Sequence, residues 1–266
     1  MASPISVSQA YHRLQSGKAR YLGRKSTSRR DLLRLALGLG IVAGGWQVWI
    51  RRPRALEFSE IPGLPGWRQL SFRGVSSLTG GATGAVFLGM GAETRPEPLS
   101  PPELCDVLYP NHQKSLPVAY FTDVNCPNCR SLEIKLATRA DKLKPTTLHL
   151  PLLGSDSLLA AKAIIAAELQ GREREFRAAI WEIGFAPQLL GRLSTASGVD
   201  FDRLRADIES PEIEFRLELA KQAAETLGIY GTPALTIGRT LVIGDVPGKM
   251  LDRLIALEAE RSPVSC

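Results

Sequence analysis

The amino-acid sequence predicts an α/β domain whose small sheet is interrupted by a block of helices. Short apolar runs of strand length surround this block, two before it and two after it. The first run leads into a helical segment that opens with a C-x-x-C sequence. A basic segment with a long apolar stretch precedes the domain and is typical of an export signal or a membrane anchor. We therefore expect a folded α/β domain that follows an N-terminal targeting element.

All of the excess positive charge lies in the N-terminal tail, residues 1–54. This tail holds eleven Lys and Arg against one acid, Asp31, whereas the remainder holds 22 bases and 26 acids. The formal charge of +6 therefore divides into +10 for the tail and −4 for the body. Because the body has no positive excess with which to displace counterions, the sequence excludes nucleic acid as a partner.

Residues 28–50 combine two arginines with an apolar stretch. Ser28-Arg-Arg-Asp-Leu-Leu-Arg34 resembles the twin-arginine export signal, and an apolar run to Ile50 follows it. The run is short for a membrane span and no Ala-x-Ala cleavage sequence closes it, so a removed signal and an uncleaved inner-membrane anchor both stay open. A buried soluble helix behind a basic loop is the third alternative. The bases before the run place the tail in the cytoplasm and the body in the periplasm.

Residues 55–110 form a Gly- and Pro-rich extension to which the sequence assigns no function. Two short strands are predicted there, at Trp67–Phe72 and Ala85–Gly89, with a glycine-rich turn between them. One of these strands would supply the first strand of the sheet.

The domain itself is expected over residues 111–262. A strand at 117–122 precedes the C-x-x-C helix, which runs from Cys126 to about Lys142, and a second strand follows at 146–150. The helical patterns that come next lie at 157–170, 173–183, 201–209 and 211–227. Two strands around a turn, and a closing helix, complete the order at 231–237, 241–243 and 249–260.

Cys126 and Cys129 are the candidate reactive residues. Residues three apart on a helix share one face, which brings the two sulfurs within reach of a disulfide bond. Cys126 would face the free amide hydrogens and the positive dipole end of the helix, which lower the pKa of its thiol. Pro127 suits the first helical position, where a missing N–H costs nothing. Cys126 is therefore the predicted attacking sulfur, and Cys129, one turn inward, the resolving sulfur.

Two other roles for the pair are an inert disulfide bridge and half of a zinc site. Zinc would need two further ligands at suitable spacing, and no second C-x-x-C or C-x-x-H pair exists, so no metal is predicted. The remaining cysteines and histidines are Cys105, Cys266, His12, His112 and His149. Cys105 and Cys266 either pair with each other or stay free, and a free buried thiol is the default expectation for Cys105.

Two separate motifs carry a resemblance to a known family. They are Phe121-Thr-Asp-Val-Asn-Cys-Pro-Asn-Cys129 and Gly228-Ile-Tyr-Gly-Thr-Pro-Ala-Leu235, which flank the helical block. Together with Gly244 they resemble the DsbA-like branch of the thioredoxin superfamily over about residues 112–262. The resemblance implies a thioredoxin fold with an inserted helical domain at about 155–228, and a cis peptide bond before Pro233.

The resemblance also implies an activity and its residues. The chain would be a thiol:disulfide oxidoreductase that uses the redox-active disulfide Cys126–Cys129 and no other cofactor. Pro233 would lie beside the pair, and the backbone of Thr232 would hold an extended substrate segment by strand-like pairing. Asn128 stands where the strongest oxidants of the family carry His, so it adds no positive charge beside the thiols. Asp123, the nearest acid, is either a proton relay or a turn-capping residue.

The expected partners are exported cysteine-containing proteins and a membrane or periplasmic redox partner, and the chain is expected to be a monomer. The alternative function is a membrane-tethered binding or chaperone module that uses the thioredoxin groove without redox turnover. The direction of electron flow is left open among oxidase, reductase and isomerase. Residues 55–110 look too short and glycine-rich for the dimerisation domain that such isomerases carry, which favours an oxidase or a reductase.

Overall fold

The computed structural model describes residues 55–71, 97–110 and 116–261, and residues from Leu56 onward fall in one compact unit. The expected signal or anchor at 28–50 and the expected strand Ala85–Gly89 lie outside the described residues, as do Cys266, His12 and His112. Within the described residues, no helix is long and apolar enough to cross a membrane.

A six-stranded sheet forms the centre of the unit, in the strand order β1-β2-β6-β5-β3-β4. The strands are β1 (Glu57–Glu60), β2 (Arg68–Ser71), β3 (Val118–Thr122), β4 (Thr146–His149), β5 (Ala234–Ile237) and β6 (Thr240–Ile243). β3 runs parallel to β4 and antiparallel to β5, β6 is antiparallel to β5, and β2 joins β6 in parallel. All five residues of β3 are buried, as expected for a strand that is covered on both faces.

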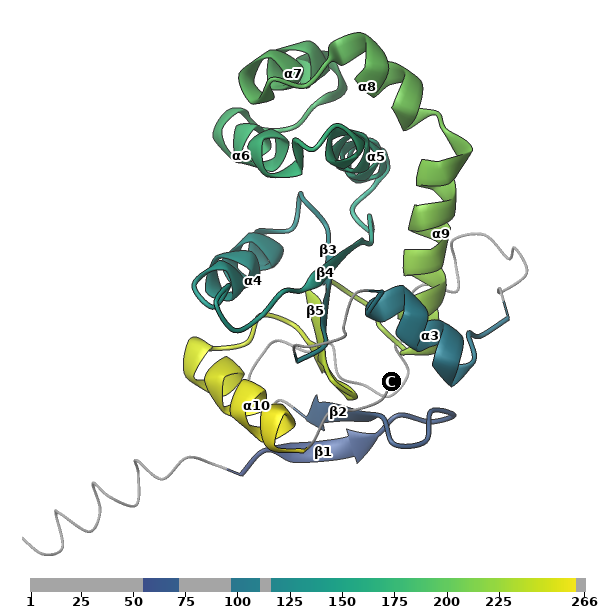
Figure 1. Cartoon of the computed structure of the whole chain (residues 1–266), viewed down its shortest axis with the longest axis vertical. Coiled ribbons are helices and arrows are strands. Elements are labelled where there is room, and N and C mark those ends of the chain that lie inside the picture. The colour runs from purple at the N-terminus through teal and green to yellow at the C-terminus, as the bar shows by residue number, and fades with distance from the viewer. Residues whose placement is uncertain (1–54, 72–96, 111–115, 262–266) are drawn as a thin grey trace, which may run out of the picture. The chain divides into compact units, whose positions relative to one another are not determined.

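Two pairs of helices cover the two faces of the sheet (Figure 1). α4 (Pro127–Ala137) and α10 (Gly248–Glu260) pack on the face that carries Val118 and Tyr120 of β3. α3 (Pro101–Leu108) and α9 (Pro211–Thr226) pack on the face that carries Ala119 and Phe121. This division follows from the alternation of side chains along a strand, since successive residues of β3 point to opposite faces.

The helices between β4 and α9 form a block with a hydrophobic core of its own (Figure 1). They are α5 (Ser155–Leu169), α6 (Glu173–Ile183), the short 3-10 helix η2 (Pro187–Leu189), α7 (Leu190–Ser197) and α8 (Phe201–Ile208). α5 is buried on several sides because alanines line it, and they allow neighbouring helices to approach closely. α7 ends at Gly198, whose φ of 69° is the left-handed conformation that glycine adopts without strain.

The N-terminal strands are held to the sheet by a buried ionic contact. Arg68 donates from Nε to Thr240 Oγ1 at 2.8 Å and from a terminal nitrogen to Glu258 Oε1 at 2.6 Å. Glu258 lies in α10 and is 3% exposed. Residues 57–71 therefore extend the sheet beyond β6 and fasten α10 over it.

Several expected elements are confirmed and others are missed. The expected strand Trp67–Phe72 is β2, and β3 to β6 and the closing helix lie within a few residues of their expected bounds. α4 ends at Ala137 rather than at about Lys142, because turns replace the helix and bury Leu143 against the sheet. The sequence reading missed β1, α3 and α7. It also took a free thiol as the default for Cys105, which is wrong because Cys105 is disulfide-bonded.

Candidate active site

Cys126 begins the active-site helix at the point where β3 ends. Its backbone is extended, with φ −89° and ψ 114°, so that it forms the N-cap of α4 and Pro127 takes the first helical position. Its amide nitrogen donates to Asp123 O at 3.0 Å, which closes a tight turn after β3. The N-cap position leaves the Cys126 sulfur beside helix amides that lack a partner of their own.

The two cysteines are reduced and lie side by side within the first turn of α4. Cys126 Sγ accepts a hydrogen bond from the backbone N–H of Cys129, with an N–S distance of 3.3 Å. Cys126 is 7% exposed and Cys129 is 2% exposed. The outer sulfur is therefore the one that an incoming group can approach, whereas the inner sulfur lies against the core.

The contact between the two cysteine side chains shifts the pKa values of the two thiols in opposite directions. The hydrogen bond from the Cys129 side chain, aided by backbone N–H groups, lowers the pKa of Cys126 to about 6 although burial acts in the other direction. For Cys129, the bond to Cys126 and burial both raise the pKa. The arrangement thus favours a thiolate at Cys126 and a protonated thiol at Cys129 near neutral pH.

The loop before β5 reaches the same sulfur. Cys126 Sγ donates to the carbonyl oxygen of Thr232 at 3.5 Å, across 106 residues of sequence. The Thr232–Pro233 peptide bond is cis, and Pro233 is buried at the start of β5. The structure therefore brings together Cys126, Cys129, Thr232 and Pro233, the residues that the two sequence motifs singled out.

Asp123 lies three residues before Cys126, and its carboxylate is held by hydrogen bonds to groups other than the two thiols. It is 2% exposed, and its two oxygens accept four hydrogen bonds. Oδ1 binds Asn125 N at 2.9 Å and Ser157 Oγ at 2.8 Å. Oδ2 binds Leu152 N at 2.9 Å and Leu153 N at 3.1 Å. Asp123 thus joins the active-site loop to the segment that leads into α5, and its geometry is that of an anchor rather than of a proton relay.

Further contacts that sequence reasoning did not find hold α4 in place. Asp245, after β6, accepts from Ser131 Oγ at 2.8 Å and from Lys135 Nζ at 2.6 Å. Tyr120 in β3 donates from its hydroxyl to Cys129 O at 2.6 Å. These partners lie in other elements of the structure, and no local sequence pattern predicts the contacts.

A second set of contacts connects α4 with α6 of the helical block. Glu133 of α4 pairs with Arg177, which is 5% exposed. The ring of Trp181 receives two guanidinium groups, those of Arg130 at 5.3 Å and Arg177 at 5.8 Å from the ring centre. The helix that carries the cysteines is therefore in contact with both the sheet and the helical block.

Exposed apolar side chains occur on the loops next to Cys126. Leu152 and Leu153, whose amides bind Asp123, are 36% and 55% exposed, and Tyr230, two residues before Thr232, is 38% exposed. The two loops thus both present large apolar side chains to the surface.

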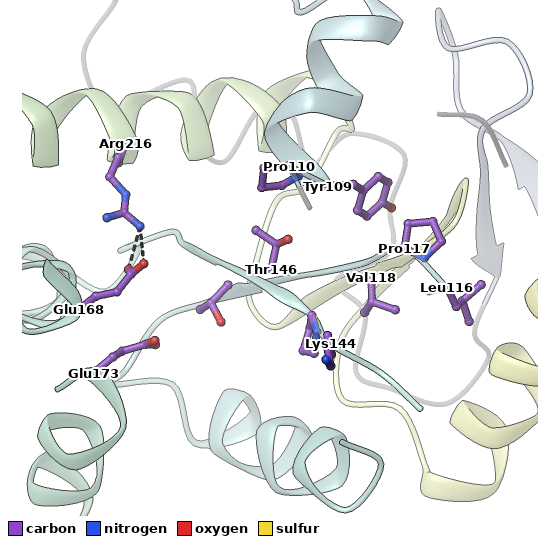
Figure 2. A pocket seen from close by; sticks show the side chains of 12 residues that line it. Tyr109, Pro110, Leu116, Pro117, Val118, Lys144, Thr146, Glu168, Glu173 and Arg216 are labelled. Carbon is purple, nitrogen blue, oxygen red and sulfur yellow. Dashed lines mark hydrogen bonds and ion pairs between the residues drawn. The ribbon is translucent and has the colours of Figure 1, made fainter. Parts of the chain in front are cut away.

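A separate cavity of about 550 Å³ lies along the outer strand β4, and neither cysteine lines it (Figure 2). Its charged end holds Glu168, which binds Arg216 with both carboxylate oxygens at 2.8 and 2.9 Å, and Glu173. Tyr109 and Val118 lie toward the other end of the cavity (Figure 2).

No group of three or more His, Cys, Asp and Glu among the described residues could hold a metal ion. His149 is buried, and burial lowers its pKa to about 3, so that it is neutral.

Comparison with known proteins agrees with this site. Residues 117–256 match the model of the DSBA-like thioredoxin domain family. The chain is similar to a thioredoxin-like oxidoreductase from Silicibacter pomeroyi DSS-3, with 29% sequence identity and a TM-score of 0.51 over 55% of this chain and 87% of that chain. No curated protein matches the chain.

Two further solved structures share the fold at lower identity. The thiol-disulfide exchange protein alpha-DsbA2 from Wolbachia pipientis is 24% identical, with a TM-score of 0.51 over 55% of this chain and 83% of that chain. A periplasmic thioredoxin-like protein from Salmonella enterica serovar Typhimurium is 20% identical, with a TM-score of 0.51 over 62% of this chain and 99% of that chain. The thioredoxin fold with a helical block is thereby confirmed.

The different pKa values of the Cys126 and Cys129 thiols predict how the stability of the reduced protein depends on pH. In the folded protein Cys126 ionises near pH 6, whereas an unfolded thiol ionises near about pH 8.5. The resulting stabilisation is complete above about pH 8.5 and is lost as the pH falls through 6. Above about pH 8.5 the Cys129 thiol ionises more readily in the unfolded chain than in the folded protein, because its pKa is raised on folding, so Cys129 lowers the stability of the reduced protein there.

Urea unfolding of the reduced protein across this range should therefore show stability rising with pH up to about 8.5. The disulfide form, which has no Cys126 or Cys129 thiol to titrate, is the control. A stability difference between the two forms that stays constant with pH would contradict the assignment of the thiolate to Cys126.

The anchoring geometry of Asp123 predicts a structural phenotype. Asp123→Asn replaces one acceptor oxygen by an N–H donor that faces two other donors, and should lower the free energy of unfolding by about 2 kcal/mol. Exchange kinetics of the folded variant should keep the pH profile of the wild type. Asp141→Asn, at an exposed position in the turns after α4, is the matched control. Unchanged stability together with a shifted pH profile would show a relay role instead.

Proposed function

Because the chain belongs to the DSBA-like thioredoxin domain family, we propose that it exchanges thiols and disulfides with exported proteins through Cys126 and Cys129. The observation that carries the proposal is the pair itself. Cys126, a thiol of lowered pKa, lies at the start of a helix, and Cys129 is buried one turn further along the same helix. This combination supplies both an attacking and a resolving group.

In the oxidising direction, the pair accepts two electrons from the substrate. A substrate thiolate attacks Cys126 Sγ of the disulfide, a mixed disulfide forms, and Cys129 leaves as a thiolate that takes up a proton. A second substrate thiolate then attacks the substrate sulfur of the mixed disulfide, which forms the substrate disulfide and releases Cys126 as a thiolate. The lowered pKa of Cys126 makes it a good leaving group in this step.

In the reducing direction the same steps run backwards. The Cys126 thiolate attacks a substrate disulfide, and Cys129 then attacks Cys126 to release the reduced substrate. Stabilisation of the thiolate favours the reduced pair and so makes the disulfide more oxidising. Asn128 is exposed and adds no charge, so we place the reduction potential between roughly −270 mV and roughly −120 mV. A redox partner in the membrane or periplasm would restore the starting state.

The substrate would lie across the Thr232 loop. An extended segment can pair with the backbone at Thr232, whose carbonyl already reaches Cys126 Sγ at 3.5 Å. The exposed side chains of Leu152, Leu153 and Tyr230 favour segments with apolar residues near the cysteine. Such segments are accessible in unfolded or partly folded proteins, which suits an enzyme that acts during export.

We further propose that the catalytic domain acts in the periplasm, exported or held at the inner membrane by residues 28–50. The +10 charge of the N-terminal tail and its twin arginines support this placement. Cys105 supports it independently, because its disulfide bond is typical of an oxidising compartment. Cys126 and Cys129 take no part in this bond, because both are free.

A trapping experiment tests the proposed chemistry. Cys129→Ala should leave Cys126 able to attack but unable to release its product, so the variant should accumulate covalent adducts with exported cysteine-containing proteins. Non-reducing gels and mass spectrometry should find these adducts, and a reductant should remove them. Cys126→Ala is the control and should form none. If Cys129→Ala captures nothing and the wild type exchanges with no model disulfide, a binding or chaperone module becomes the better description.

A second experiment tests the proposed route of export. A fusion of residues 1–60 to a reporter that is active only outside the cytoplasm should be active. Replacing Arg29 and Arg30 by Lys should abolish the signal if the twin-arginine pathway is used. Undiminished export of the Lys variant would exclude that pathway, and an inactive wild-type fusion would exclude the periplasmic placement.

A further inference from the structure

We propose that Tyr120 is a positioning residue for the redox pair, because its buried hydroxyl binds the backbone of Cys129 and thereby aims the donors of Cys129 at Cys126. The inference rests on the proposed redox function and deepens it. It assigns a role to a residue that lies outside both sequence motifs. Tyr120 is part of β3, all five residues of which are buried.

The contact is short and specific. Tyr120 is 2% exposed and belongs to the same hydrophobic cluster as both cysteines, on the α4 face of the sheet. Its hydroxyl donates to Cys129 O with an oxygen–oxygen distance of 2.6 Å. Burial raises the pKa of the phenol, so the hydroxyl stays protonated and remains a donor wherever the thiols titrate. The bond is therefore present at every pH at which exchange occurs.

The helix alone does not require this bond. Inside α4 the carbonyl of Cys129 can accept the amide of the residue four positions further on, as in any α-helix. Tyr120 adds a second donor to the same oxygen. The side-chain hydrogen bonds that Asp245 and Arg177 make to α4 bind later residues, namely Ser131 and Lys135 for Asp245 and Glu133 for Arg177. Tyr120 thus holds the turn that contains the resolving cysteine, which those contacts leave free.

The position of Cys129 matters because its atoms stabilise the Cys126 thiolate. The backbone N–H of Cys129 lies 3.3 Å from Cys126 Sγ, and the Cys129 thiol makes the largest contribution to the lowered pKa of Cys126. The carbonyl that Tyr120 binds, the N–H and the thiol all belong to Cys129, so tying this carbonyl to β3 restricts the backbone and the side chain from which both donors project. Loss of the tie lets the turn move, weakens both bonds and destabilises the thiolate.

The chain offers a matched control for this contact. Tyr109 is 1% exposed and donates from its hydroxyl to Gly238 O, also at 2.6 Å, at the hairpin between β5 and β6. Burial raises the pKa of this phenol as well. Tyr109→Phe and Tyr120→Phe therefore remove the same atom from equally buried bonds to a backbone carbonyl, and they differ in whether that carbonyl belongs to the redox pair.

The test measures three quantities in the reduced, full-length protein and in both variants. Thiolate absorbance gives the pKa of Cys126, equilibration with glutathione gives the reduction potential, and urea unfolding gives stability. Tyr120→Phe should raise the pKa of Cys126 by up to about one unit, since one hydrogen bond is worth about that much. It should also make the reduction potential more negative. Tyr109→Phe should lose stability to a similar extent and leave the pKa and the potential unchanged.

Each outcome distinguishes the inference from the proposed function. If the wild type exchanges with glutathione and Tyr120→Phe matches Tyr109→Phe in pKa and potential, the positioning role is overturned and the redox function stands. If Tyr120→Phe fails to fold while Tyr109→Phe folds, the positioning role is overturned as well, because the hydroxyl then serves the fold. If the wild type exchanges no electrons with glutathione, the proposed function fails and the inference falls with it.

Discussion

The antiparallel pairing of β3 with β5 is the constraint on which the site depends. Its register sets Phe121 opposite Ala234, so the end of one strand and the start of the other meet at the same edge of the sheet. The loop that leads to Cys126 and the loop that holds Thr232 therefore face each other, although 106 residues separate them. The helical block is inserted between these two strands, so it can vary in length without disturbing their register.

The positions of the two cysteines at the helix start then give their sulfurs different charges near neutral pH. A helix start favours negative charge on Cys126, whereas burial disfavours negative charge on Cys129. The first thiol therefore loses its proton more readily than the second. Because the Cys129 thiol donates to Cys126, the sulfur that stabilises the Cys126 thiolate is also the sulfur that attacks Cys126 in the proposed mixed disulfide. The contact between the two side chains thus lowers the pKa of the outer thiol and raises that of the inner thiol.

Local patterns were sufficient to predict the strands around the two motifs and the helix that opens at Cys126. α3 was missed because its surroundings are rich in Gly and Pro, although Ser100 and Glu103 form a capping box that marks its start. Turn-capping was one of the two roles expected for Asp123, but its bonds to Ser157, Leu152 and Leu153 could not be predicted, because these partners approach only after the chain has folded. The same holds for Tyr120, whose partner is a backbone oxygen that the sequence does not distinguish from any other.

Three of the four hydrogen bonds of Asp123 have a consequence for how the molecule can open. They tie the loop before Cys126 to the segment that leads into α5 and to the first turn of α5, so that fluctuations of the helical block and of this loop are coupled. Sub-global opening of such a contiguous unit exposes both parts together. A molecule whose helical block has opened locally therefore also loses the contacts that lower the pKa of Cys126, so its outer thiol is less ionised near neutral pH than in the folded protein.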